Sequence, residues 1–169
     1  YYAIRHQSNS QGMATNAIYG FTNMLLKVIR DHKPDRLAVV FDSKGPTFRH
    51  EIFSDYKANR PPMADDMAVQ IPYIKEVTAG FNIPIYEMQG FEADDLIGTV
   101  AQRAVEQGFD VIMVTGDKDF IQLVSDRCIL WDPMKDKKTT ARTVREEMGI
   151  EPIQFIDVLG LAGDSSDNI

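Results

Sequence analysis

The stretch LAVVFD (residues 37–42) places five apolar residues in a row and then ends on an aspartate. A continuous apolar run of this length is typical of a β-strand that is buried on both faces, as in a parallel sheet. A second run, VIMV (residues 111–114), is followed by TGD and also leads into an aspartate, Asp117. The two runs predict two core strands of one sheet, each ending close to an acidic residue.

Helical patterns surround these strands. Apolar residues at helical spacing predict helices over residues 14–30, 65–79, 93–107, 143–148 and 152–161, with a short one near 119–123. Further strands are expected at 83–86 and 128–131, and the polar, basic stretch 43–63 is expected to form a long loop or an irregular helix. Because strands alternate with helices, we expect an α/β fold with a mainly parallel twisted sheet and helices on both faces.

Length and composition indicate an ordinary globular chain. The 169 residues are 44% hydrophobic and 25% charged, which suits one domain over residues 1–169. No apolar run approaches the ~18 residues that span a bilayer, and no leader pattern is visible. The single cysteine, Cys128, excludes an internal disulfide and a paired-thiolate zinc site. A reduced, cytoplasmic location is expected, and the scattered His6, His32 and His50 are expected to be surface residues rather than metal ligands.

Eight carboxylates fall at the ends of predicted strands or helices. In such folds the ligand site lies beyond the carboxyl ends of the strands, so one sheet edge could gather all of them. They come from four separate segments, LAVVFD, GFEADDLIG, VIMVTGDKD and LAGDSSDN. The residues are Asp42, Glu92, Asp94, Asp95, Asp117, Asp119, Asp164 and Asp167.

Each of these acids also has a simpler interpretation. Aspartates at helix starts commonly cap free backbone amides, and for any one pair alone capping is the commoner role. Together, however, so many carboxylates in one place repel each other unless cations neutralise them or some stay protonated. Oxygen ligands without a cysteine or histidine cluster suit Mg²⁺ or Mn²⁺. Two Mg²⁺ ions bound close together can promote the hydrolysis of phosphodiester bonds. A calcium-storage site is a poorer fit, because no loop has the residue spacing of such a site.

The net charge of −7 by itself argues against a broad nucleic-acid-binding surface. Without the eight acids, however, the chain has 18 basic and 17 acidic residues, so the acidity is local to the predicted site. The stretch 44–60 also mixes cations with aromatic rings, a combination that grips phosphates and stacks on unpaired bases. An ordinary solvated loop is the alternative interpretation. The residues concerned are Lys44, Phe48, Arg49, Phe53, Tyr56, Lys57 and Arg60.

Four stretches closely resemble the 5′ nuclease domain of bacterial DNA polymerase I, a member of the flap endonuclease superfamily. They are AVVFDSKGPTFRHEIFSDYKANRPPMADD, GFEADDLIGTVA, VTGDKDFIQLVSD and LGLAGDSSDNI, in one order over the whole chain. The resemblance implies a PIN-like 5′ nuclease fold with a basic helical arch. It also implies a hydrolase that uses two Mg²⁺ ions, with Mn²⁺ able to substitute, and that acts as a 5′-3′ exonuclease and flap endonuclease on DNA.

The resemblance also implies roles for individual residues. Asp42, Glu92 and Asp94 match the ligands of the first metal position, and Asp95 is an additional acid of the bacterial motif. Asp117, Asp119, Asp164 and Asp167 match those of the second position. Lys57 and Arg60 match the arch residues that contact the scissile phosphate, with Lys44, Arg49 and Tyr56 beside them on the path of the DNA strand.

The family pattern implies partners and context. The expected substrates are DNA 5′ ends or flaps, including RNA–DNA primers, in replication and repair. We also expect a monomer, no membrane contact and fusion to a downstream polymerase. The family has a strand with a further aspartate before the region of Tyr1 and a helix-hairpin DNA-binding module after Ile169, so the chain is expected to be a fragment whose own activity is in question.

Three other functions compete with this interpretation. A PIN-type ribonuclease would share the sheet and the acids, but such domains are typically shorter and lack the basic stretch from Lys44 to Arg60. A phosphoacceptor receiver would need an acid pair after the first strand, where only Asp42 stands. A non-catalytic DNA-binding fragment remains open at this stage.

Overall fold

The computed structural model describes residues 5–164 and 167–168 of the chain. The chain divides into two compact units. Unit 1 runs from the N-terminal residues to Phe41 and includes Pro61–Glu87, and unit 2 comprises Asp42–Arg60 and the chain from Met88 onward. All eight acids of the predicted site and the basic stretch 44–60 belong to unit 2. The prediction of one domain over residues 1–169 stays a prediction.

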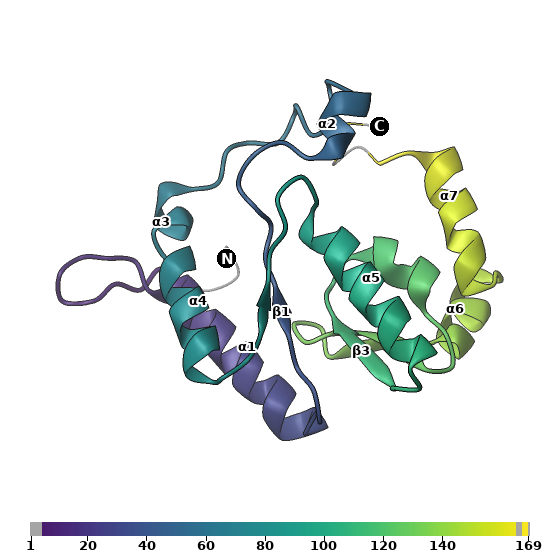
Figure 1. Ribbon diagram of the computed structural model, residues 1–169, viewed down its shortest axis with the longest axis horizontal. Coiled ribbons are helices and arrows are strands. Elements are labelled where there is room, and N and C mark those ends of the chain that lie inside the picture. Colours follow the sequence, from purple (N-terminus) through teal and green to yellow (C-terminus); the bar gives the residue numbers. More distant parts are fainter. Residues whose placement is uncertain (1–4, 165–166, 169) are drawn as a thin grey trace. The chain divides into compact units, whose positions relative to one another are not determined.

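Two helices and a short strand pair make up most of unit 1. Its elements are α1 (Asn16–His32), β1 (Val39–Val40), α3 (Asp65–Ala68), α4 (Ile71–Gly80) and β2 (Ile85–Tyr86). α1 and α4 lie side by side, as Figure 1 shows. Leu25 and Val28 of α1 and Ile74 of α4 are buried, so the apolar face of each helix forms the core of this unit. The helix predicted over residues 14–30 is confirmed.

A buried glutamine organises unit 1. The Gln70 side chain is fully buried, and its Oε1 accepts hydrogen bonds from the backbone N–H groups of Ala17 and Ile18, at 2.8 and 3.2 Å. Gln70 therefore caps the first turn of α1 from a distant part of the chain. The single helix predicted over residues 65–79 is wrong, because the chain forms α3 and α4 with a break between them. Pro72, near the start of α4, has no N–H with which to continue α3.

The strand predicted from LAVVFD is shorter and more exposed than expected. Only Val39 and Val40 form β1, and they pair in parallel with Ile85 and Tyr86 of β2. Both valines are partly exposed, so the prediction of a strand buried on both faces is wrong here. The reason is that β1 and β2 form a two-stranded sheet within the described residues, and each strand has one neighbour.

Unit 2 contains a three-stranded sheet, one long helix and several short ones. Its elements are α2 (Phe48–Ile52), α5 (Ala93–Glu106), β3 (Val111–Val114), the 3-10 helix η1 (Lys118–Leu123), β4 (Cys128–Asp132), β5 (Lys137–Thr139), α6 (Ala141–Met148), η2 (Pro152–Gln154) and α7 (Phe155–Ala162). The helix predicted over residues 93–107 and the VIMV strand are confirmed as α5 and β3. α5 is followed by Gly108, whose φ of +90° is in the left-handed region that glycine adopts without strain.

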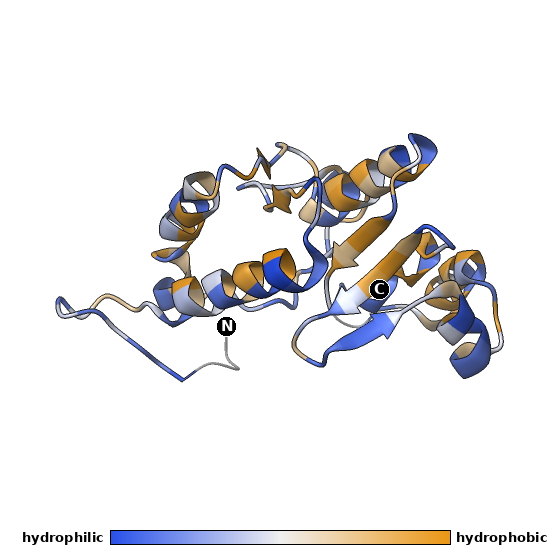
Figure 2. Cartoon of the chain, turned by 90° about the horizontal axis from the view of Figure 1, so that it is seen from below, coloured by the Kyte–Doolittle hydropathy of each residue, from blue (hydrophilic) through white to orange (hydrophobic). Residues whose placement is uncertain are grey.

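The sheet of unit 2 is mixed. β3 pairs in parallel with β4, with Val111 opposite Cys128, and β4 pairs antiparallel with β5. β5 was not predicted, because Lys137-Lys138-Thr139 has no apolar residue that would mark a strand. Figure 2 shows the contrast between the hydrophobic strands β3 and β4 and the hydrophilic edge strand β5. The α/β class and two parallel strand pairs are thus as predicted, but the described residues form two sheets instead of one.

The core of unit 2 lies around β4. Cys128 and Leu130 are buried in a cluster with residues of α5, α6 and α7, and Trp131 on the same strand is 1% exposed. Burial raises the pKa of the Cys128 thiol to about 11. At Gly98 of α5, a Cβ atom would lie 3.2 Å from Leu123 Cδ1, so glycine permits the close approach of η1. Among the described helices, none combines the length and the hydrophobicity that crossing a bilayer requires.

Candidate metal and nucleic-acid site

The start of α5 gathers four of the predicted acids, Asp42, Glu92, Asp94 and Asp95. Ala93 N donates a hydrogen bond to Asp42 Oδ1 at 2.8 Å, and Glu92 N donates to Asp95 Oδ2 at 2.9 Å. Asp42 follows β1 in the chain, and the backbone amide of Ala93 holds it at this helix N-terminus. Both carboxylates therefore cap free amides of α5, as the simpler interpretation of the sequence expects.

A second acidic group follows β3. Asp117 Oδ1 accepts a hydrogen bond from Asp119 N at 2.9 Å and so caps η1. Asp119 Oδ1 is buried and has no hydrogen-bond partner in the part of the chain that the structure describes. A buried carboxylate oxygen without a partner carries a free-energy cost unless a proton or a cation compensates its charge.

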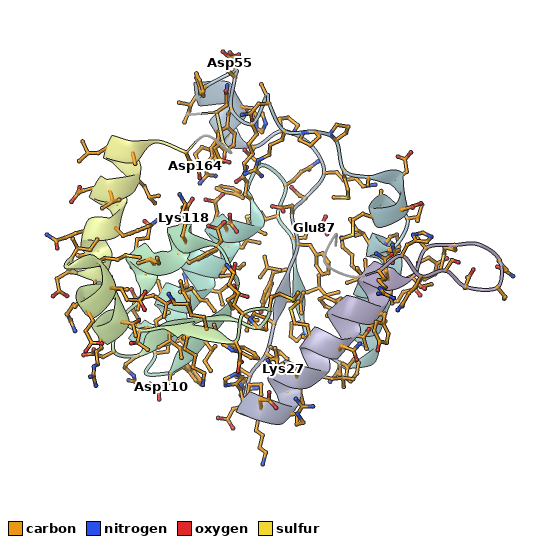
Figure 3. All side chains as sticks on the ribbon, turned by 180° about the vertical axis from the view of Figure 1, so that it is seen from behind. Lys27, Asp55, Glu87, Asp110, Lys118 and Asp164 are labelled. Carbon is orange, nitrogen blue, oxygen red and sulfur yellow. The ribbon has the colours of Figure 1, made fainter. Side chains whose placement is uncertain are left out.

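The acids influence each other's ionisation. Desolvation by the surrounding protein, followed by the charges of Asp117 and Asp42, raises the pKa of Asp94 to about 6. Desolvation also raises the pKa of Asp119, and the charges of Asp117 and Asp164 add to this effect. Carboxylates from all the predicted acidic segments therefore lie near enough to repel each other, as clustering around one site requires. Figure 3 labels Asp164, the member of this group after α7.

The basic stretch lies directly against these acids. The ammonium of Lys57 lies 2.7 Å from Glu92 Oε2, and the guanidinium of Arg60 pairs with Asp167. The Tyr56 hydroxyl oxygen lies 3.1 Å from both Glu92 Oε2 and Asp167 Oδ2, so its one hydrogen can be donated to either carboxylate. Burial, together with these two charges, raises the pKa of Tyr56. The predicted phosphate-binding cations are thus ion-paired with predicted metal ligands.

Arg49 is paired differently. Its Nη1 and Nη2 donate to the two oxygens of Asp95 at 2.8 and 2.7 Å, and its guanidinium lies 4.6 Å from the centre of the Phe48 ring. Asp95 therefore accepts three hydrogen bonds from the protein when its bond from Glu92 N is included. The hydrogen bonds from Arg49 lower the pKa of Asp95. The pair joins α2 to the first turn of α5.

Backbone contacts complete the arrangement. Lys57 N donates to the carbonyl oxygen of Asp167 at 3.0 Å, and Asn168 Nδ2 donates to the carbonyl oxygen of Asp55 at 3.0 Å. Asp167 N in turn donates to the carbonyl oxygen of Asp164. The segment around Lys57 is therefore fixed to the chain after α7. Lys44 lies in an exposed position before α2.

His50 has a structural role that the sequence does not predict. The residue is partly exposed, and its Nδ1 accepts a hydrogen bond from Thr47 N at 3.1 Å and helps to cap α2. Its ring is 5.4 Å from the Tyr56 ring in an edge-on arrangement, which helps to hold Tyr56 in its buried position. The spacing of Thr47 and His50, typical of a capping box, is a signal that could have found it.

The donor chemistry of the site fits a hard divalent cation. Within residues 5–164 and 167–168, no three acidic, histidine or cysteine side chains are arranged to hold one ion as they stand. The donors are nevertheless all carboxylate oxygens, which Mg²⁺ and Mn²⁺ prefer. Asp119 Oδ1, which has no hydrogen-bond partner among the described residues, and the raised pKa values of Asp94 and Asp119 also indicate negative charge that a cation would compensate.

Comparison with known families identifies the chain. The family described as "5′-3′ exonuclease, N-terminal resolvase-like domain" matches residues 1–149. The chain belongs to this family. The resemblance seen in the acidic motifs of the sequence is thereby confirmed.

Curated relatives of this family are similar over the whole chain. DNA polymerase I of Caldicellulosiruptor bescii is 40% identical over 175 residues, which cover 100% of this chain and 21% of that protein. A 5′-3′ exonuclease of Aquifex aeolicus is 42% identical over 169 residues, which cover 100% of this chain and 58% of that protein. The chain thus spans between about a fifth and three fifths of the length of these relatives.

Solved structures share the fold. The T5 5′-exonuclease with bound divalent metal ions (zinc) superimposes with a TM-score of 0.74 at 20% identity, covering 89% of this chain and 60% of that one. A T5 flap endonuclease, solved as a pseudo-enzyme-product complex with DNA and metal ions, gives a TM-score of 0.73 at 19% identity, covering 88% and 58% of the two chains. The α/β fold of the family is therefore confirmed for this chain.

Proposed function

We propose that this chain is the catalytic core of a metal-dependent 5′-3′ exonuclease and flap endonuclease, which hydrolyses phosphodiester bonds at the 5′ ends of DNA. One observation carries the proposal: carboxylates and cations from distant parts of the sequence meet in unit 2, through pairs such as Lys57 with Glu92. Negative oxygen ligands beside phosphate-binding cations are what a metal-assisted phosphodiester hydrolase needs.

The carboxylates fall into two proposed metal positions. Asp42, Glu92 and Asp94 would hold one divalent cation, and Asp117, Asp119, Asp164 and Asp167 a second. Desolvation, followed by repulsion from neighbouring carboxylates, raises the pKa of Asp94 and supports the first group. Asp119 Oδ1, without a hydrogen-bond partner in the described part of the chain, supports the second. Bound Mg²⁺, or Mn²⁺ in its place, would activate a water molecule and stabilise the leaving oxygen.

Asp95 has a different role in this proposal. The sequence suggested it as an additional metal ligand, but both of its oxygens accept hydrogen bonds from Arg49. Its Oδ2 also caps the backbone amide of Glu92. These contacts support Asp95 and Arg49 as a pair that positions Glu92, while Glu92 itself remains a proposed ligand.

The cations of the basic stretch would bind the substrate. Lys57 and Arg60 are the proposed catalytic cations, which would stabilise the negative charge that develops on the scissile phosphate. Lys44, with its exposed position, would contact the DNA backbone further from the reacting bond. Arg49 and Tyr56 would support this surface from within the protein, because their polar atoms face Asp95, Glu92 and Asp167.

The relatives support a wider context. We propose that the chain acts as a monomer on DNA 5′ ends, flaps and RNA–DNA primers during replication and repair in the cytoplasm. Relatives named DNA polymerase I support fusion to a polymerase. The DNA present in the T5 flap endonuclease structure supports DNA as the substrate.

Cleavage and metal binding together test this function. A 5′-labelled flap duplex and a labelled single-stranded RNA are each incubated with the chain, with Mg²⁺, with Mn²⁺ or with a chelator. We expect metal-dependent cleavage near the flap junction, no comparable cleavage of the RNA, and loss of flap cleavage in Asp119→Asn. Asp110→Asn is the matched control, because Asp110 is an exposed aspartate of unit 2 that pairs with Arg127.

The opposite pattern would contradict the proposal. Preferential cleavage of the RNA would favour a PIN-type ribonuclease. If calorimetry shows no metal binding and the flap duplex is not cleaved, the proposal of a metal-dependent nuclease is wrong.

A further inference from the structure

Residues Asp55–Arg60 (the 55–60 segment) form hydrogen bonds and ion pairs with two of the proposed metal ligands. Glu92 Oε2 is contacted by both the Lys57 ammonium, at 2.7 Å, and the Tyr56 hydroxyl, at 3.1 Å. Asp167 receives Arg60 on Oδ1 and the Tyr56 hydroxyl on Oδ2. Both oxygens of Asp167 and one of Glu92 are thus occupied by the segment.

These contacts compete with a bound cation. A divalent cation coordinates carboxylate oxygens through the same lone pairs that accept hydrogen bonds. Two positive side chains next to the cation would also be repelled by it at short range. Lys57, Arg60 and a metal ion therefore compete for Glu92 and Asp167, and each weakens the binding of the others.

The backbone of the segment is suited to release. Lys57 has a φ of +57°, in the left-handed region that a residue with a side chain adopts only when surrounding contacts hold it there. Those contacts are the hydrogen bond of Lys57 N to the Asp167 carbonyl and the ion pair with Glu92. Loss of the ion pairs would remove much of what keeps this conformation in place.

We propose that the 55–60 segment is an autoinhibitory latch, which competes with the divalent cation for Glu92 and Asp167 and is released when the cation binds. This inference rests on the proposed function, because it takes both carboxylates as metal ligands. Release frees Lys57 and Arg60 to bind phosphate only when the metal is present. The cation shifts the equilibrium towards the open segment because it binds that state more tightly.

Limited digestion with trypsin reports the opening of the latch without any measurement of activity. Lys57 offers one cleavable bond, to Ala58, whereas the Arg60 bond is blocked by Pro61. With saturating Mg²⁺ or Mn²⁺ we expect cleavage after Lys57 to become ~5-fold faster or more, because the open population rises. Cleavage after Lys137, an exposed residue of unit 2 paired with Glu147, serves as the internal control and should not change.

Metal affinity gives a second, independent measurement. If the latch competes with the cation, the apparent dissociation constant is the intrinsic one divided by the open fraction. Tyr56→Phe removes the latch hydrogen bond of the hydroxyl to Glu92 or Asp167 but replaces no proposed ligand, so it should bind Mn²⁺ more tightly in calorimetry. Without metal, trypsin should also cleave this variant after Lys57 faster than it cleaves the wild-type chain. Tyr19→Phe is the matched control, because Tyr19 is an exposed tyrosine of α1.

The outcomes separate the latch from the proposed function. If calorimetry shows Mn²⁺ binding but the metal leaves tryptic cleavage after Lys57 unchanged or slower, the latch is wrong. The proposed metal site is then still supported. An unchanged Mn²⁺ affinity in Tyr56→Phe would also count against the competition. Absence of any Mn²⁺ binding in the wild-type chain would overturn the proposed function, and the latch with it.

Discussion

Arg49 and Asp95 form an ion pair with two hydrogen bonds, of 2.8 and 2.7 Å, although 46 residues separate them in the chain. The pair ties α2 to the first turn of α5. Because Asp95 also caps the amide of Glu92, the pair fixes the neighbour of a proposed metal ligand. A cation that the sequence suggested for DNA binding thus has a structural partner inside the protein.

Loss of this ion pair should lower stability. Arg49→Met leaves the partly buried Asp95 without its guanidinium, and we expect the free energy of unfolding to fall by about 1–2 kcal/mol. Urea denaturation of the metal-free chain measures the change. Arg142→Met is the control, because its exposed pair with Glu146 should contribute only about 0.3–0.5 kcal/mol. Equal losses in the two variants would argue against a special role for Arg49.

Lys57 should affect the rate of cleavage. Lys57→Ala removes a cation that is placed to stabilise the transferring phosphate, and such a loss commonly costs ~3 kcal/mol, or roughly a hundredfold in rate. Single-turnover cleavage of a 5′ flap measures it, with circular dichroism to verify the fold. Lys135→Ala, at an exposed lysine of the same unit, should cleave at the wild-type rate. A wild-type rate in Lys57→Ala would remove the catalytic role.

Divalent metal should stabilise the folded chain. A cation that binds only the folded state contributes about 1.4 kcal/mol at ten times its Kd, so Mg²⁺ or Mn²⁺ should raise the melting temperature. Asp117→Asn should reduce this rise and increase stability without metal, because it removes a charge that repels Asp94 and Asp119. Asp110→Asn provides the comparison. A melting curve indifferent to both metals in all three proteins would contradict a clustered metal site.

The pKa of Asp94 predicts a pH dependence of stability. The folded chain holds the Asp94 proton up to a pKa of about 6, whereas the ordinary value is 3.8. Between these values the folded state binds more protons than the unfolded state, so the Asp94 contribution makes stability fall as pH rises. Asp94→Asn mimics the protonated form. Without metal it should be more stable than wild type above pH 6, with the difference disappearing below the ordinary pKa. A constant difference across pH would show that Asp94 does not titrate in this way.

The buried Gln70 should be essential to unit 1. Gln70→Ala leaves the amides of Ala17 and Ile18 without their acceptor, and unsatisfied buried donors cost about 1–3 kcal/mol each. Thermal unfolding should therefore occur at a clearly lower temperature. Gln122→Ala is a milder comparison, because its side chain makes one hydrogen bond, to the carbonyl oxygen of Asp119. Similar melting temperatures for the two variants would contradict the capping role.

The sequence by itself determined the elements with strong local patterns. α1, α5 and β3 form close to where the apolar spacing predicts them. The reason is that the hydrophobic periodicity of a helix or strand depends on residues that are close together in the sequence. The sequence also predicts that the acids and the basic stretch act as one functional set, and this stays a prediction. The glycine after α5 was likewise predictable from its place at the end of a helical pattern.

Tertiary structure alone decided which of these residues meet. Lys57 forms an ion pair with Glu92, which lies 35 residues further along the chain. Arg60 pairs with Asp167, which lies 107 residues further along. β5 pairs through its backbone without an apolar pattern, and Gln70 caps a helix more than 50 residues away. A carboxylate in the sequence can equally cap an amide, pair with a cation or bind a metal. The choice is made only when packing brings a particular partner within hydrogen-bonding distance.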